Sequence, residues 1–442
     1  MSKFLKLSYV KQRLYSGNKK ELIVDSLLAI IIRVGGAISS FLMNLVVARQ
    51  LGPFDSGGFF LCFAVITVLS MFVRMGGDNL LIKYVSIYGN EEKWKTVKSI
   101  VSHVAKKTFI FSAVITTVLV MFHVFVARDV FHKEYISGTL FWMLLSTPLF
   151  ASYTLFSFAF QGLNKVLFSV FIQNIMVPVS VCILTLILRP GNSVELAKLY
   201  FICSAVTLLL TLFLWSKSVP RGNPAEEVKH PDGLWKSSYA MWASAIFSLG
   251  MQWGGQFIAG IFCPQKQLAQ LAVAQRTSML ITFILVAINL VSAPKFASLY
   301  KQGKSENLKR YAINSTRIMV LFATPMVLII MCFPNAIMSL FGPGFVEGAP
   351  MLVILSLGQY VNVLTGSVTL LLMMSGHEKD MRNIQFMGGV LCVILNYILI
   401  KTNGVLGASV AIAISVSVQN LVCVGMVKKR LGFNTLAIWS RG

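Results

Sequence analysis

The sequence predicts an all-α polytopic membrane protein, with about twelve transmembrane helices in two six-helix lobes around a central cavity. Three observations predict this fold class. Of the 442 residues, 56% are hydrophobic and 12% are charged, whereas soluble domains are about a quarter charged. Apolar runs of roughly 18–25 residues, long enough to cross a bilayer as helices, recur along the whole chain. Loop glycines and lysines repeat in a way that divides the chain into two similar halves.

The apolar runs divide the chain into spans and short connections. The longest polar break, residues 216–236, is the midpoint, and we interpret it as a linker between a first lobe, 23–215, and a second lobe, 237–427. Polar and basic tails, 1–22 and 428–442, flank the lobes. The expected spans are 23–47, 57–85, 109–126, 137–160, 166–188, 197–215, 239–262, 268–297, 312–332, 351–374, 384–400 and 405–426.

The lysines and arginines indicate an orientation. If the N-terminus lies in the cytoplasm, 26 of the 39 Lys and Arg residues fall in cytoplasmic tails and loops, and seven fall in outside loops. This bias follows the positive-inside rule, and an even number of spans then places both termini in the cytoplasm. The same distribution accounts for the net charge of +23, so we do not expect a nucleic-acid partner.

The two halves of the chain repeat. Gly89 pairs with Gly303 after the second span of each half, and Gly162 pairs with Gly376 after the fourth, each pair 214 residues apart. Six spans per half give both halves the same orientation. Such a parallel repeat suits a transporter whose two halves rock about a central cavity.

The sequence lacks the patterns of an enzyme or a cofactor site. The seven cysteines lie singly in or beside apolar runs, and the five histidines form no cluster. There is no Ser/His/Asp set, phosphate-binding glycine loop or metal-ligand spacing. The loops are too short to contain a soluble catalytic domain. We therefore expect no enzyme activity and no cofactor.

Three arginines fall inside predicted spans: Arg33 in the first, Arg74 in the second and Arg276 in the eighth. A charge at the bilayer centre costs roughly 2.5–3.5 kcal/mol on insertion scales, so such residues usually face a bundle interior or a wet cavity. Arginines gathered in one cavity would bind phosphate through bidentate hydrogen bonds. The alternative is that each arginine pairs locally or extends to a membrane interface.

Asp78 is the acid that stands out among the spans. It lies four residues after Arg74, with Gly76 and Gly77 between them, so a helix would place the two charges on one face. Asp78 could titrate in an ion-coupled cycle or act as the fixed counter-ion of Arg74. The paired glycines loosen the helix or allow close packing.

A polar cluster falls inside the seventh span. Gln252, Trp253 and Gln256 have helical spacing. They could hydrogen-bond to a sugar and stack on it, or they could be ordinary contacts between helices.

Five segments resemble a known family. LVVARQLGPFDSGGFF at 45–60 and FVRMGGDNLLIKYVS at 72–86 resemble the first two helices of polysaccharide flippases. Residues 271–304, 340–383 and 403–415 resemble later parts of the same proteins. The family is that of the Wzx-type lipid-linked oligosaccharide flippases, within the MOP superfamily that also contains the MATE drug exporters and the lipid II flippase.

The resemblance implies a fold, a substrate and a location. The fold is MATE-like, with two six-helix lobes around a V-shaped cavity. The substrate is an undecaprenyl-diphosphate-linked oligosaccharide, such as an O-antigen unit, moved from the cytoplasmic to the periplasmic leaflet of the bacterial inner membrane. The implied partners are this lipid, membrane lipids, H⁺ or Na⁺, and other polysaccharide assembly proteins.

Site residues follow from motif positions. Related flippases bind the diphosphate with cavity arginines, and Arg33, Arg74 and Arg276 match those positions. Asp78 matches an acidic position of the lipid II flippase. That flippase has extra C-terminal helices, whereas this chain ends after the twelfth span, which favours the Wzx-type family.

A second function stays open at this stage. A MATE-like antiporter of cations or drugs would need cavity carboxylates and few cavity arginines, and here arginines outnumber acids within the spans. A membrane enzyme or scaffold is disfavoured by the short loops and the repeat.

Overall fold

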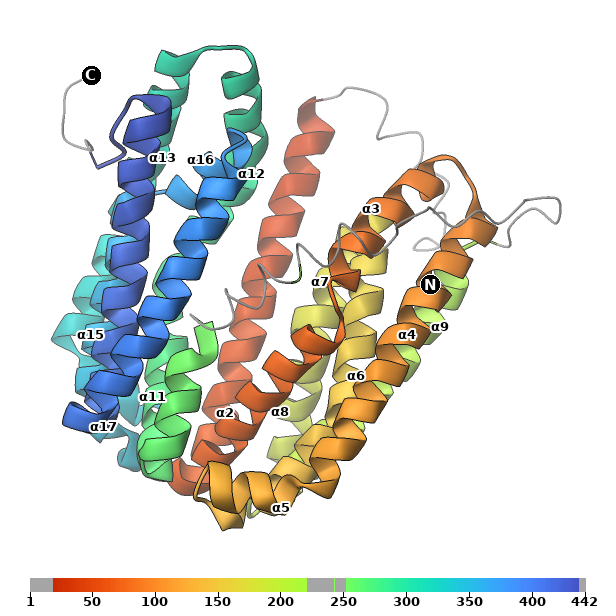
Figure 1. The fold of residues 1–442 in the computed structure, drawn as a ribbon, viewed down its shortest axis with the longest axis vertical. Coiled ribbons are helices and arrows are strands. Elements are labelled where there is room, and N and C mark those ends of the chain that lie inside the picture. Colours follow the sequence, from red (N-terminus) through yellow and green to blue (C-terminus); the bar gives the residue numbers. More distant parts are fainter. Residues whose placement is uncertain (1–18, 221–241, 243–251, 437–442) are drawn as a thin grey trace.

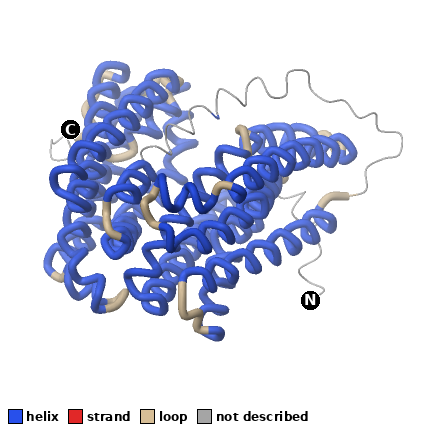
Figure 2. The backbone as a smooth tube through the Cα atoms, turned by 60° about the horizontal axis from the view of Figure 1, so that its bottom comes forward, coloured by secondary structure: helices blue, strands red, loops and turns tan. Residues whose placement is uncertain are grey.

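The computed structural model describes residues 19–220, 242 and 252–436, with side chains from Val34 onward except Leu290. The described residues contain helices and turns and no strand (Figure 2). Nine helical stretches among them are long and apolar enough to cross a membrane. Two of these, α2 (Lys19–Val73) and α17 (Glu378–Leu431), each join two helices at a non-helical glycine, Gly52 or Gly404. The other expected spans are all helical over most of their length, and of the expected seventh span, 239–262, the described residues 252–262 are helical.

The first lobe is built from the elements up to Ser218, and residues 221–236 of the expected linker lie outside the described residues. In chain order these are α2, α3 (Gly77–Asn90), α4 (Trp94–Met121), α5 (His123–Phe125), η1 (Val126–Val130), η2 (Glu134–Ile136), α6 (Ser137–Gly162), α7 (Val166–Phe171), η3 (Ile172–Met176), α8 (Val177–Leu188) and α9 (Ser193–Ser218).

The second lobe begins in its described part with residues 252–262. It continues with α11 (Gln265–Ser278), η4 (Met279–Thr282), α12 (Phe283–Lys301), α13 (Ser305–Cys332), α14 (Pro334–Ser339), η5 (Pro343–Gly348), α15 (Ala349–Thr365), α16 (Val368–Met374) and α17.

The second span is not one continuous helix. It breaks between α2 and α3, where Met75 and Gly76 have left-handed φ values of 50° and 77°. Glycine adopts this conformation without steric cost, and here it ends one helix and starts the next. Gly77 then packs closely, because a Cβ there would lie 3.0 Å from Val104 and 3.1 Å from Leu155. The expected effect of the paired glycines is therefore confirmed, and it divides the expected span 57–85 into two helices.

The two halves share the same pair of turns. Glu92 and Gly303 are left-handed after the second and eighth spans, and Asn164 and Gly376 are left-handed after the fourth and tenth. In each turn the next amide donates to the carbonyl five residues earlier, the Schellman arrangement that closes a helix. The four bonds are Lys93–Tyr88 (2.9 Å), Lys304–Leu299 (3.2 Å), Lys165–Phe160 (2.9 Å) and His377–Leu372 (3.0 Å).

These turns correct the register of the repeat. Glu92 and Gly303 are 211 residues apart, and Asn164 and Gly376 are 212 apart. The matching of loop glycines predicted 214. The repeat exists in the structure, but Glu92 and Asn164 occupy the left-handed positions that glycine occupies in the second half.

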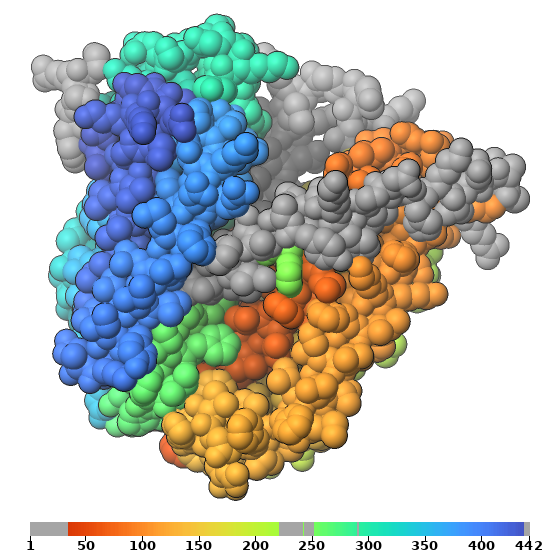
Figure 3. Space-filling model, in the orientation of Figure 1, coloured from red at the N-terminus to blue at the C-terminus, as the bar shows by residue number. Residues whose placement is uncertain are grey.

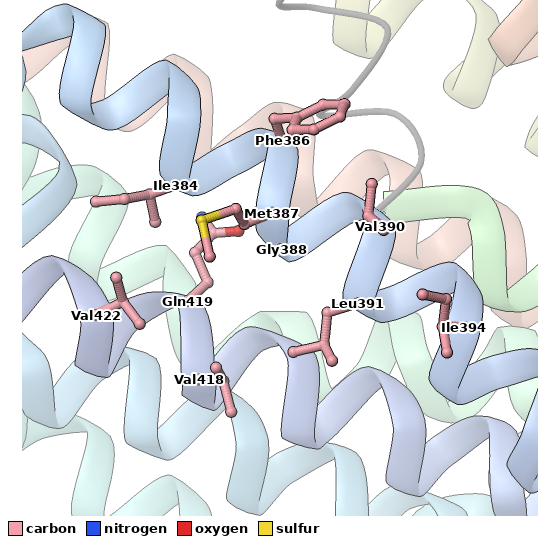
Figure 4. A pocket seen from close by; sticks show the side chains of 10 residues that line it. All are labelled: Ile384, Phe386, Met387, Gly388, Val390, Leu391, Ile394, Val418, Gln419 and Val422. Carbon is pink, nitrogen blue, oxygen red and sulfur yellow. The ribbon is translucent and has the colours of Figure 1, made fainter.

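The two lobes meet on one side of the molecule and diverge on the other (Figure 1, Figure 3). We call the diverging side the basic side, because the four turns above lie there with their lysines. One core cluster combines residues of both lobes, such as Val47, Phe341 and Leu268. A second cluster, around Phe296 and Leu371, belongs to the second lobe alone. The joint core therefore fills only part of the depth of the molecule.

Close glycine packing seals the lobes on the opposite side. A Cβ on Gly57 would lie 2.2 Å from the backbone oxygen of Gln265, and one on Gly58 would lie 2.3 Å from its side-chain nitrogen. The Lys133 amine donates to the Gly260 carbonyl at 2.6 Å, and burial lowers the pKa of that amine. Arg49 donates to the Leu340 carbonyl. The lobes are therefore joined on this side by the close backbone approach that glycine permits at position 57 and by side chains that donate to backbone carbonyls.

Candidate functional site

Arg276 lies where the lobes meet, in the last turn of α11. Its Nη1 donates to the Asn44 side-chain oxygen on α2. Its guanidinium carbon lies 4.4 Å from the ring centre of Phe60 and 5.4 Å from that of Phe63. Both rings belong to the second half of α2, so the cation contacts both spans of that hairpin. Stacking on aromatic faces is a favourable setting for a guanidinium.

The charge of Arg276 is not balanced by a carboxylate within the described residues. Its Nη2 is sealed from solvent and has no hydrogen-bond partner there. A buried cation without an acidic partner is costly in a protein. The guanidinium therefore has both unused donor capacity and unbalanced charge, which is the chemistry of an anion site.

The described end of the seventh span, residues 252–262, contacts the neighbours of this cation. The Trp253 ring lies 6.4 Å from the Phe63 ring, and Gln275 donates to the Gln252 carbonyl at 3.1 Å. Gln256 is buried and donates to the Phe60 carbonyl at 3.2 Å. Gln256 thus makes a contact between helices, whereas the Gln252 side chain is exposed and Trp253 is half-buried.

Arg74 and Asp78 form a separate, self-contained pair. Arg74 Nε donates to the two carboxylate oxygens of Asp78 at 2.8 and 3.0 Å, and its Nη1 donates to Ser70 at 2.6 Å. The Arg74 side chain is 9% exposed and that of Asp78 is 17% exposed. The pairing that the four-residue spacing predicts is confirmed. This geometry fits the counter-ion role, and the ion-coupling role of Asp78 stays a prediction.

The structure does not bring Arg74 to Arg276. From Phe60, which stacks on Arg276, α2 runs to Val73, roughly 20 Å at about 1.5 Å per residue. The two cations have no partner in common. Arg33 lies in α2, but its side chain is outside the described residues. The expected three-arginine cluster is therefore reduced, in the described residues, to Arg276 alone at the lobe contact.

Sequence reasoning missed most of the environment of Arg276. Phe60 and Phe63 are ordinary apolar residues in an apolar span. The sequence offers one signal, because Phe59, Phe60 and Phe63 form an aromatic run on the helix after the Gly57–Gly58 pair. Trp242 was also missed; its indole nitrogen donates to the Phe72 carbonyl at 3.0 Å, beside the helix break.

Solved structures share this fold. An inward-facing multidrug resistance MATE transporter of the MOP superfamily has a TM-score of 0.68 at 16% identity, covering 93% of this chain and 99% of that one. The lipid II flippase MurJ, inward closed, has a TM-score of 0.73 at 14% identity, covering 91% and 87%. A MOP superfamily transporter from Pyrococcus furiosus has a TM-score of 0.67 at 14% identity, covering 94% and 96%. The chain thus has a MATE-like fold.

The family follows from the sequence itself. The sequence model of the family described as "Polysaccharide biosynthesis protein" matches residues 23–300, and the chain belongs to that family. The model described as MatE matches residues 243–398. A membrane protein of Methanocaldococcus jannaschii, described as uncharacterized, is 21% identical over 399 residues, which are 84% of this chain and 77% of that protein.

Proposed function

We propose that this protein is a flippase for an undecaprenyl-diphosphate-linked oligosaccharide. It moves the lipid from the cytoplasmic to the periplasmic leaflet by alternating access, and arginine binds the diphosphate. The observation that carries the proposal is Arg276, a cation at the lobe contact with an unpartnered nitrogen and no carboxylate among the described residues. The family to which the chain belongs supports a polysaccharide role.

The chemistry of the site fits this substrate. A diphosphate is a dense anion that a guanidinium can bind through parallel N–H···O bonds. We assign the exposed Gln252 side chain and the half-buried Trp253 ring, which packs against Phe63, to the saccharide. Arg33 is the further cation that we assign to the cavity. Arg74 contributes less, because Asp78 already neutralises it.

The orientation follows from the lysine-rich turns. We assign the basic side to the cytoplasm, and both termini with it, because basic loops are retained there. The lobes diverge on that side, so the described state would receive a substrate from the cytoplasmic leaflet (Figure 1). The inner membrane of a bacterium is the corresponding location.

A second function has its own support. The MatE sequence match and the MATE structures favour an ion-coupled exporter of cationic small molecules. Such a site needs unpaired carboxylates to bind a cation. Asp78, the acid in the expected spans whose side chain is described, is paired with Arg74, which disfavours this alternative.

A complementation experiment tests the proposal. Cells that lack the protein are complemented with the wild type, Arg276→Ala or Arg276→Lys at matched membrane levels, and surface polysaccharide and lipid-linked saccharide are measured. Arg430→Ala, which removes an exposed cation on α17, is the control. We expect null and Arg276→Ala cells to lose surface glycan and to retain lipid-linked saccharide, whereas the control rescues fully.

Other outcomes are equally informative. If null cells keep their surface glycan and become sensitive to cationic drugs, the exporter function replaces the proposed one. If Arg276→Ala rescues as well as the wild type, Arg276 is not the diphosphate-binding residue.

A further inference from the structure

Lys133 links the two lobes from a turn of the first lobe. The residue is 6% exposed, and its amine donates to the Phe131 carbonyl at 3.2 Å and to the Gly260 carbonyl at 2.6 Å. Phe131 belongs to the first lobe, whereas Gly260 belongs to the seventh span, in the second lobe. The turn follows α5 and η1, at the end of the molecule where the lobes meet (Figure 1). A buried cation therefore bridges one backbone carbonyl from each lobe.

The Gly260 carbonyl needs a donor from outside its own helix. A helical carbonyl normally accepts a hydrogen bond from the amide four residues later, but residue 264 is proline, which has no N–H. Gly260 is buried, and a Cβ there would lie 2.6 Å from the Leu61 side chain of the first lobe. Because the lobes pack so closely here, the Lys133 amine is the donor that satisfies this carbonyl.

A second cation crosses between the lobes in the same direction. Arg49 on α2 donates to the Leu340 carbonyl, just after α14. Both of these residues are exposed, so water can replace their bond when it breaks. Lys133 and its acceptor are buried, so no such replacement is possible while the lobes remain in contact. Of the two links, that of Lys133 therefore costs more to lose.

We infer that Lys133 controls the opening of the lobes on the side opposite the basic side, through its bond to the Gly260 carbonyl. The bond holds this side closed, because a buried carbonyl without a donor is costly. Separation of the lobes exposes both the amine and the carbonyl to water, which then hydrogen-bonds to each of them. The inference goes beyond the proposed function, since it requires only that the lobes separate on this side during transport, whatever the substrate.

Thiol reactivity measures this opening without a ligand. Purified full-length protein in nanodiscs is treated with an impermeant methanethiosulfonate reagent, and mass spectrometry gives the modification rates of two buried thiols. One is the native Cys263, which is 3% exposed. The other is introduced by Phe341→Cys, where the wild-type ring is 1% exposed and packs on Phe41 across the lobes. Separation of the lobes exposes both positions to the reagent.

The decisive variant is Lys133→Met, which keeps an unbranched side chain but leaves the Gly260 carbonyl without its donor in the closed state. We expect both thiols to react about tenfold faster, which corresponds to about 1.4 kcal/mol. Loss of the charge alone would act in the opposite direction at Cys263. Burial raises the pKa of that thiol and the Lys133 amine opposes the rise, so removing the amine leaves less reactive thiolate.

The matched control is Lys198→Met. It removes an exposed lysine whose amine lies over the Trp142 ring within the first lobe, so both rates should stay at the wild-type value. Gly260→Ala perturbs the Lys133 contact from the second lobe and serves if Lys133→Met does not fold. Its Cβ would press on Leu61, so both rates should again rise.

Two results would overturn the inference. If both thiols react at the wild-type rate in Lys133→Met and in Gly260→Ala, this contact does not control opening. If Cys263 alone reacts faster, the variants loosen one local contact while the lobes stay closed. Either result leaves the proposed substrate untouched, because no ligand enters the measurement.

Discussion

Removal of the Asp78 charge alone should lower the free energy of unfolding strongly, and removal of both charges of the Arg74–Asp78 pair should restore most of it. Asp78→Asn removes the charge that balances the Arg74 guanidinium, whose side chain is 9% exposed, and leaves it only neutral acceptors, an amide oxygen and Ser70. Removing one partner of a buried ion pair costs roughly 3–5 kcal/mol of unfolding free energy. Because Asp78 is partly exposed, we expect a loss of about 3 kcal/mol. The free energy of unfolding in mixed micelles is the measurement.

A double variant separates pairing from other effects. Arg74→Leu/Asp78→Leu removes both charges, and replacing a buried pair with apolar residues is often neutral, so most of the stability should return. The pair Arg430–Asp380 on α17 provides the control, because its arginine side chain is 44% exposed, and Asp380→Asn should have a much smaller effect. The counter-ion role would be refuted if Asp78→Asn were as stable as the wild type, or if the double variant were less stable than either single one.

Two further predictions concern glycines. Gly57→Ala places a Cβ 2.2 Å from the Gln265 backbone oxygen, so it should lower the unfolding free energy by about 1–3 kcal/mol. It should also slow disulfide formation in a Phe41→Cys/Phe341→Cys pair, whose wild-type rings lie 5.6 Å apart across the lobes. The control is Gly35→Ala, which meets no neighbour within 4 Å and should stabilise the helix by about 0.5–1 kcal/mol. Equal cross-linking in both would contradict the close packing. Gly404 has a φ of 59°, so Gly404→Ala should lower the unfolding free energy by about 1–2 kcal/mol. Its control, Gly425→Ala, meets no atom within 4 Å and should be tolerated. Similar stabilities of the two variants would show that the α17 turn does not need glycine.

Local features of this chain could be predicted from the sequence, because they depend on neighbours along the chain. Hydropathy places the spans, and the four-residue spacing of Arg74 and Asp78 predicts their pairing. The helix break was only half predicted, because Gly76 signals flexibility but Met75, a residue that rarely adopts a left-handed φ, gives no such signal. The left-handed turn at Glu92 was not predicted for the same reason. Matching glycine to glycine therefore paired Gly303 with Gly89 instead of Glu92 and gave the wrong register for the repeat.

The site at Arg276 depends on the tertiary fold. Its hydrogen-bond partner Asn44 is 232 residues away in sequence, and no local pattern links them. Phe60 and Phe63 match the apolar composition of their span and gain a role only when α11 packs beside α2. The sequence could therefore nominate Arg276 as a costly charge within the membrane, but only the folded lobes assign its neighbours.

The most direct test of the central claim is transport by the purified protein. Proteoliposomes are loaded with the lipid-linked saccharide extracted from null cells, and the fraction of glycan accessible to an impermeant oxidant is followed over time. We predict that the wild type makes lumenal-leaflet glycan accessible, whereas Arg276→Ala behaves like protein-free vesicles. If wild-type vesicles match protein-free vesicles but transport a cationic dye, this chain is an exporter and the flippase proposal is wrong.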